Sequence, residues 1–208
     1  MFYPDKAIEL HKDYFSVHFN KGKAHENLGE ALQAIESFAK SLALNPNDNR
    51  VRSLLGGVLL THAKSLSNAE AVEYLLQAIK HVDDSIANID AEDPRTLHLH
   101  CEIGNALGYD AEVNLQYCHA ALGANSEKIT NSNNEDVTLN LLGIISKEIG
   151  KHDDAIQYFD KGMAVNAESY DLLINIAYLH TDMDNYDLAK AYFEKAENLD
   201  DLLLCHGV

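Results

Sequence analysis

The sequence predicts an all-α protein in which helix-turn-helix repeats stack side by side as a solenoid. Three observations lead to this prediction. One spacing of small and aromatic residues recurs along the chain, and glycines and a proline fall where the helices of each repeat would end. Apolar residues within each repeat also recur three and four positions apart, which places them on one face of a helix.

The recurring spacing starts at a small residue inside an apolar segment. From Gly22, steps of twelve, four and three residues lead to Ala34, Phe38 and Ser41, and five more lead to Pro46. The same spacing recurs from Gly143, with Ala155 and Phe159, and from Ala177, with Ala189 and Phe193. Two further copies have an altered first interval, and their structural residues are Gly56 with Ala71, and Gly104. Because one helix pair cannot bury its own apolar face, such copies must stack.

Each repeat is expected to contain two helices and a tight turn. In the first complete repeat, helices over 15–28 and 30–44 flank Gly29, and the second stops before Pro46 because proline cannot continue a helix. The turns of later repeats are expected at Gly108, at Gly150 and at Asp184-Asn185. Helix starts are expected at Asp93-Pro94 and at Ser169.

These elements divide the chain into successive segments. They are a partial repeat or orphan second helix over 1–14, complete repeats over 15–48, 49–94, 95–135, 136–169 and 170–203, and a tail over 204–208. The 48-residue step from Gly56 to Gly104 predicts an extended second helix in 49–94, and 95–135 is degenerate. The polar stretch after Gly123 is expected to be a loop. Leu202–Leu204 either fold back as a cap or form an apolar end through which copies associate.

This pattern resembles the tetratricopeptide repeat family over nearly the whole chain, most completely over Gly22–Pro46. The resemblance implies a right-handed solenoid whose first helices line a concave groove. The sequence departs from the family where an early aromatic of the first helix is replaced, at His18, Arg52, His100, Leu139 and Leu173. Ala167 also stands where the fourth repeat would carry its terminal proline.

The resemblance implies that a partner peptide binds in this groove. The residues expected to line it are Phe19, Asn20, Lys23, Asn27, Arg50, Ser53, Asn105, Asn140, Lys147, Asn175 and Tyr178. Asn20 and Asn175 stand where several peptide-binding relatives place an amide, which can donate to and accept from a peptide backbone. The alternative is that these asparagines are simply exposed or cap helices.

Composition narrows the classes of partner. Thirty-three acidic residues against sixteen basic ones give a net charge of −17, and without a Lys/Arg cluster this field repels nucleic acid. The longest apolar run, residues 54–60, is too short to insert in a membrane, and no signal peptide precedes it. Three cysteines outside any CxxC pair are typical of reduced thiols. We therefore expect a cytoplasmic protein that binds other proteins.

The sequence gives no sign of catalysis. It contains no nucleophile elbow, phosphate-binding glycine loop or HExxH motif. His98, Cys101, Cys118 and His119 are zinc-type ligands, but their spacing fits no standard finger, so neither a metal nor another cofactor is expected. The predicted function is a non-catalytic scaffold or adaptor that binds a peptide segment of a partner. Two alternatives remain open: the repeat portion of a larger enzyme, such as a protein glycosyltransferase, and a homo-oligomer that self-assembles through uncapped ends.

Overall fold

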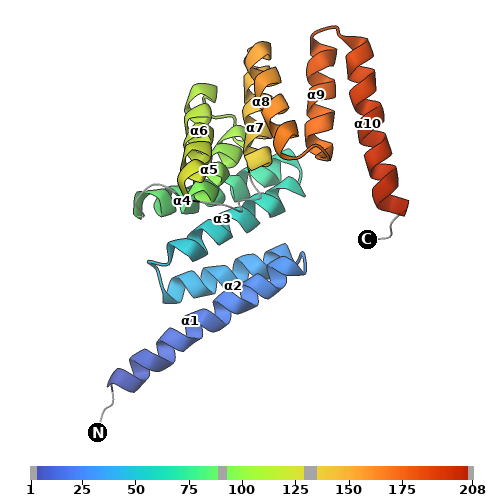
Figure 1. Ribbon diagram of the computed structural model, residues 1–208. Helices are drawn as coiled ribbons and strands as arrows, with labels where there is room; N and C mark the ends of the chain where they lie inside the picture. Colours follow the sequence, from blue (N-terminus) through green and yellow to red (C-terminus); the bar gives the residue numbers. More distant parts are fainter. Residues whose placement is uncertain (1–3, 89–92, 129–134, 206–208) are drawn as a thin grey trace. The chain divides into compact units, whose positions relative to one another are not determined.

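Helices make up all the regular structure that is described. The computed structural model describes residues 4–88, 93–128 and 135–205, and every regular element in these ranges is an α-helix (Figure 1). The helices are α1 (Pro4–Asn27), α2 (Ala31–Leu44), α3 (Asn49–Lys64), α4 (Asn68–Asn88), α5 (Pro94–Ala106), α6 (Ala111–Lys128), α7 (Glu135–Glu148), α8 (His152–Val165), α9 (Tyr170–Asp182) and α10 (Tyr186–Cys205). The all-α prediction is confirmed. The chain forms two compact units, unit 1 over Met1–Asp110 and unit 2 over Ala111–Val208, which are described separately.

The tight turns have left-handed backbone conformations. The predicted turn residues have positive φ at Gly29 (72°), Gly108 (72°), Gly150 (76°) and Asp184 (60°). Glycine adopts this conformation without the steric penalty of a Cβ atom. After α1, the amides of Gly29 and Glu30 also donate to the carbonyls of Glu26 and His25, which satisfies the end of the helix. The predicted turn positions are confirmed.

Side-chain caps fix where three of the first helices begin. The side chains of Asp48, Asp93 and Ser169 each accept one hydrogen bond from the backbone amide three residues later in the chain. The three bonds are 3.2, 3.3 and 3.4 Å long. These caps start α3, α5 and α9. The expected helix starts at Asp93-Pro94 and Ser169 are therefore confirmed.

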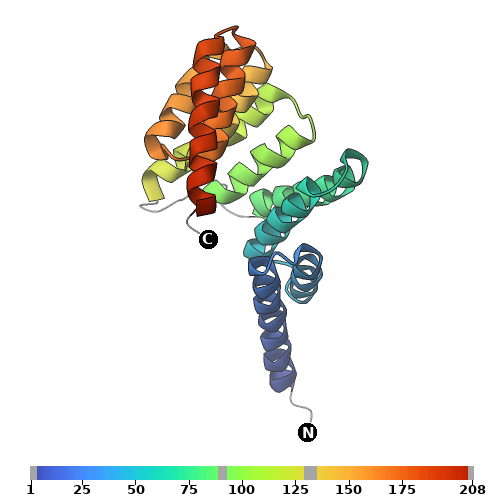
Figure 2. The same ribbon diagram turned by 90° about the vertical axis from the view of Figure 1, so that its right-hand side faces the viewer.

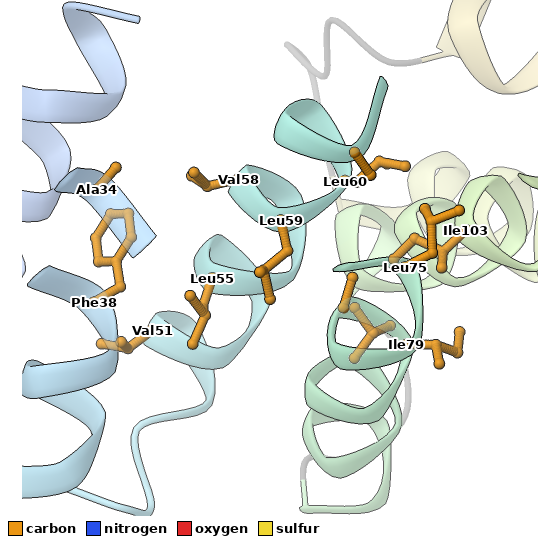
Figure 3. Packing of buried hydrophobic residues seen from close by; sticks show 13 residues of the cluster. Ala34, Phe38, Val51, Leu55, Val58, Leu59, Leu60, Leu75, Ile79 and Ile103 are labelled. Atoms are coloured by element: carbon orange, nitrogen blue, oxygen red, sulfur yellow. The ribbon is translucent and has the colours of Figure 1, made fainter. Parts of the chain in front are cut away.

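In unit 1, one aromatic ring packs between three helices. Phe38 of α2 is fully buried and lies over Gly22 of α1, where an added Cβ would fall 2.6 Å from the ring. The same side chain belongs to a core cluster with Val51 and Leu55 of α3, which lie on the facing side of that helix (Figure 3). Gly22 therefore lets α1 and α2 approach closely, and Phe38 joins this pair to the next helix.

Unit 2 repeats this construction. The ring of Phe159 in α8 would collide with a Cβ at Gly143 of α7, and Phe159 is 1% exposed. Phe159 also clusters with Leu172 and Ile176 of α9. Figure 2 shows α7, α8, α9 and α10 packed as neighbours within this unit. The fold class is thus an α-solenoid of stacked helix pairs.

The α3–α4 pair departs from the spacing read from the sequence. The side chain that fills the space over Gly56 belongs to Val82, at 2.7 Å from an added Cβ, with the Ala78 carbonyl next to it. Ala71, which the repeat spacing pairs with Gly56, is half-buried nearer the start of α4. The reason is that α3 continues further past Gly56 than α1 does past Gly22, so the antiparallel partner residue lies correspondingly deeper in α4.

Three expected boundaries also differ. Residues 4–14 are not a separate orphan helix, because α1 continues through them without a turn. The polar segment after Gly123 remains helical to Lys128 before the described residues stop. Leu202–Leu204 continue α10 as helix and do not fold back as a cap. The expected loop over 129–134 lies outside the described residues.

Candidate interaction surfaces

Two pairs of polar side chains connect the first helices of unit 2. The amide of Asn175 in α9 donates to Oδ1 of Asn140 in α7 at 2.9 Å, and Nζ of Lys147 lies 3.2 Å from Oδ2 of Asp182. Within each helix these residues are seven positions apart, so they lie two turns apart on one face. Ile144 lies between them on α7. We call Asn140, Ile144, Lys147, Asn175 and Asp182 the α7/α9 surface.

The corresponding residues of unit 1 form a second surface on α1 and α3. The guanidinium of Arg50 lies 4.3 Å from the centre of the Phe19 ring, a cation–π geometry. Lys23 is bonded to Glu26 one turn along α1 at 2.6 Å. Two further predicted residues of this helix, Asn20 and Asn27, have exposed side chains.

Two predicted groove residues have other surroundings. The hydroxyl of Ser53 is bonded to that of Thr96 at 2.8 Å and to that of Ser85 at 3.0 Å. Ser53 therefore connects α3 with α4 and α5, and its hydrogen-bonding capacity is used within the fold. Asn105 is half-buried in the last turn of α5. The structure thus brings Phe19 together with Arg50 and Asn140 with Asn175, and it places Ser53 in a helix-to-helix network.

Unit 2 also carries an open cavity of about 390 Å³ between α9 and α10. We call it the α9/α10 pocket, and its lining residues are Thr181, Tyr186, Ala189, Lys190, Phe193, Glu194 and Glu197. Tyr178, a predicted groove residue, is 51% exposed beside it and meets Phe193 edge-on at 5.5 Å between ring centres. Sequence reasoning did not find this pocket, although the position of Phe193 in the last repeat was a signal for it.

A partly buried ionic cluster in unit 1 was also missed. Glu102 of α5 is bonded to Lys64 of α3 at 2.5 Å and lies 3.5 Å from His98. Burial raises the pKa of Glu102, but the hydrogen bonds from His98 and Lys64 outweigh it and lower the pKa to about 2. His100, expected where relatives carry an aromatic, is buried and paired with Asp83 at 3.1 Å. Burial lowers the pKa of His100, and Asp83 opposes that shift in part.

The histidines and cysteines do not form a metal site in the described part of the chain, where no group of three His, Cys, Asp or Glu residues could hold an ion. His119 instead meets Tyr158, with 3.2 Å between its Nε2 and the phenol oxygen. Cys101 and Cys118 are each disulfide-bonded, so the expectation of reduced thiols is wrong for both. Disulfides persist in oxidising surroundings, and the cysteines therefore lend no support to a cytoplasmic location. Among the described helices, none is long and apolar enough to cross a bilayer.

Comparison with protein families gives two matches, both to models described as tetratricopeptide repeat. One covers residues 15–48 and the other residues 170–201. The first segment covers α2 and the part of α1 from residue 15 onward, and the second covers α9 and α10 as far as residue 201. Comparison with curated proteins gives no match.

Several solved structures share the fold over most of the chain. MamA from Desulfovibrio magneticus RS-1 is 13% identical with a TM-score of 0.69, covering 91% of this chain and 96% of that one. PilF from Pseudomonas aeruginosa is 18% identical with a TM-score of 0.70, covering 90% and 77%. A tetratricopeptide repeat protein from Parabacteroides merdae ATCC 43184 is 19% identical with a TM-score of 0.63, covering 88% and 65%. At these identities the likeness concerns the fold alone.

Proposed function

The chain belongs to the tetratricopeptide repeat family, and on this premise we propose that it is a non-catalytic scaffold that binds an extended segment of a partner protein. The binding site in this proposal is the α7/α9 surface. The observation that supports it is the hydrogen bond between the amides of Asn175 and Asn140. This bond fixes the orientation of the two amide side chains on a partly exposed face, and amides can hydrogen-bond to a peptide backbone.

The chemistry of an amide explains why this pair suits a peptide. The bond to Asn140 uses one N–H of Asn175, and the Asn175 side chain has a second N–H and a carbonyl oxygen in addition. A peptide backbone offers one acceptor and one donor per residue, so an amide can bind it whatever its side chains are. Holding the amide in advance also reduces the entropy that binding costs.

The pair of Lys147 and Asp182 marks the second end of the α7/α9 surface and so defines its length. Seven residues of helix span about 10 Å, and an extended peptide advances about 3.3 Å per residue, so about three peptide residues reach from the amide pair to Lys147 and Asp182. This ion pair is partly exposed, with 23% of the Lys147 side chain and 50% of the Asp182 side chain accessible. Both signs of charge are therefore present, and a partner of mixed charge fits better than a strongly basic one.

The proposal predicts that Asn175→Ala separates binding from stability. Partners captured from native lysate by the wild-type chain are identified, and a synthetic segment of the strongest one is titrated against each variant. We expect Asn175→Ala and Asn140→Ala to weaken binding about tenfold, since each removes hydrogen bonds worth about 1–1.5 kcal/mol, with almost no change in melting temperature. Gln157→Ala removes an exposed amide from α8, away from this surface, and is the matched control. Unchanged binding in both asparagine variants, or unfolding of either, contradicts the proposal.

A further inference from the structure

Two junctions between neighbouring repeats in this protein share one set of contacts. The second helix of a repeat supplies an alanine and a phenylalanine, which in α2 are Ala34 and Phe38. The next first helix, α3, buries Val51, Leu55 and Val58 in the same cluster (Figure 3). All five side chains are at most 4% exposed.

The junction between α8 and α9 uses the same positions. Ala155 and Phe159 of α8 cluster with Leu172, Ile176 and Leu179 of α9, and all are buried. In α3 and in α9 alike, the three contact residues lie five before, one before and two after the small residue of that helix. The junction is therefore defined by a sequence register, and this register can be applied to any other first helix of the chain.

Helix α10 presents the second-helix half of this junction, but no helix follows it in the described chain. Its alanine and phenylalanine are Ala189, which is buried, and Phe193, which is half-buried in the lining of the α9/α10 pocket. Four residues after Phe193 stands Glu197, where α2 and α8 carry Leu42 and Met163 packed against their clusters. The aromatic residue of the junction is thus present in the pocket as Phe193, whereas the apolar residue four positions later is replaced by the acidic Glu197.

Helix α1 presents the other half. Counted from Gly22, the three contact positions are Val17, Lys21 and Ala24. Val17 is 58% exposed, and the other two are also exposed. The middle position is apolar in α3 and α9 but is a lysine here. Glu197 of α10 and Lys21 of α1 thus stand where the α2–α3 and α8–α9 junctions are apolar, and these two side chains have opposite charges.

We propose that the α9/α10 pocket binds α1 of a second copy of this chain, so that copies associate head to tail. In this arrangement Val17 and Ala24 cover the pocket as their counterparts cover Phe38 and Phe159. Lys21 lies against the Phe193 ring, where a cation–π contact is favourable, and next to Glu197.

The charges around the pocket favour this occupant over an apolar helix. Two carboxylates, Glu194 and Glu197, and one cation, Lys190, line the pocket, and Lys190 lies 3.6 Å from Glu194. On α1, Lys21 stands at the contact position, and Lys23 is paired with Glu26. A basic face is therefore attracted, and an acidic face is repelled. The two surfaces differ from each other, so the contact is heterologous and can extend beyond two copies. This inference does not depend on peptide binding at the α7/α9 surface.

Sedimentation velocity of the full chain over a wide range of concentration tests the proposal. The wild-type chain is expected to show mass-action growth beyond the monomer. Lys21→Glu and Glu197→Lys, which each place like charges in contact, are each expected to weaken self-association about tenfold or more. Lys80→Glu makes the same charge change as Lys21→Glu, but at an exposed position of α4, and this variant is expected to associate as the wild type does.

Mixing the two charge variants gives the decisive comparison. An equimolar mixture of Lys21→Glu with Glu197→Lys brings opposite charges together again at every junction between unlike chains. We therefore expect the mixture to associate more strongly than either variant alone, while unfolding curves show all chains to be folded. A wild-type chain that stays monomeric throughout, association insensitive to both variants, or a mixture no stronger than its components each overturns the proposal.

Discussion

Gly143 shows how one absent methyl group sets the distance between two helices. Its Cα faces the ring of Phe159 so closely that a Cβ would collide with three ring carbons, and the same relation holds between Gly22 and Phe38. The ring is buried on all sides and cannot move aside without disturbing α9, since Phe159 also clusters with Leu172. The glycine is therefore required by packing rather than by backbone conformation.

We predict that Gly143→Ala lowers the free energy of unfolding by about 1–3 kcal/mol, because the added methyl overpacks a rigid site. Gly123 of α6 is the matched control, as it is also a helical glycine but has nothing within 4 Å of an added Cβ. Gly123→Ala should raise stability by about 0.5–1 kcal/mol through helix propensity. Urea unfolding of both variants measures the difference, and equal effects of the same sign would contradict the packing argument.

At the scale of elements, α3 and α5 are connected by the ion pair of Lys64 with Glu102. The hydrogen bonds from His98 and Lys64 lower the pKa of Glu102 to about 2 from 4.5 despite its burial. The carboxylate is thus favoured in the folded state. Its contribution to stability is complete above pH 4.5 and is lost as pH falls from 4.5 towards 2.

We predict that Glu102→Gln removes this pH dependence. Between pH 4.5 and 2 the wild-type chain should lose about 2–3 kcal/mol more unfolding free energy than the variant does. The difference is obtained from urea unfolding at a series of pH values. Glu36→Gln breaks an exposed pair with Lys40 on α2 and serves as control. A gap between wild type and Glu102→Gln that stays constant with pH would show that Glu102 is not the group responsible.

The elements differ in how far the sequence alone could place them. The turn glycines and the helix starts at Asp93 and Ser169 follow local rules, so the sequence was enough to find them. That the rings of Phe38 and Phe159 lie directly over Gly22 and Gly143 is shown only by the structure. The α3–α4 register depends on how far α3 extends past Gly56, which no local signal marks. Helix α6 continues past Gly123 although its polar composition suggested a loop.

The candidate surfaces were less predictable than the fold. Asn140 and Asn175 were each selected from their position in a repeat, but their hydrogen bond depends on how two helices stack. Ser53 occupies an equivalent position and is instead bonded to Ser85 and Thr96, because α4 and α5 happen to place hydroxyls beside it. The hydrogen-bond partner of such a residue lies more than thirty positions away in the chain. The position of a residue within its repeat does not determine which side chain that partner is.

At the scale of the whole molecule, stability in a stack is the sum of each repeat and its junctions with neighbours. Position in the stack should then decide the cost of an otherwise identical substitution. Phe38, Phe159 and Phe193 stand at one register position in three repeats. The first two are buried between three helices, whereas Phe193 is half-buried beside an open pocket.

We therefore predict that Phe38→Ala and Phe159→Ala each cost about 3–5 kcal/mol of unfolding free energy, and that Phe193→Ala costs half of that or less. Chemical unfolding in dilute solution, where the chain is monomeric, measures all three without a contribution from association. An interior loss below about 1 kcal/mol would contradict the stacking of repeats through these rings. Equal losses at all three positions would mean that Phe193 is covered as completely as the interior rings, and the α9/α10 pocket would then have no free aromatic ring on which a second copy could dock.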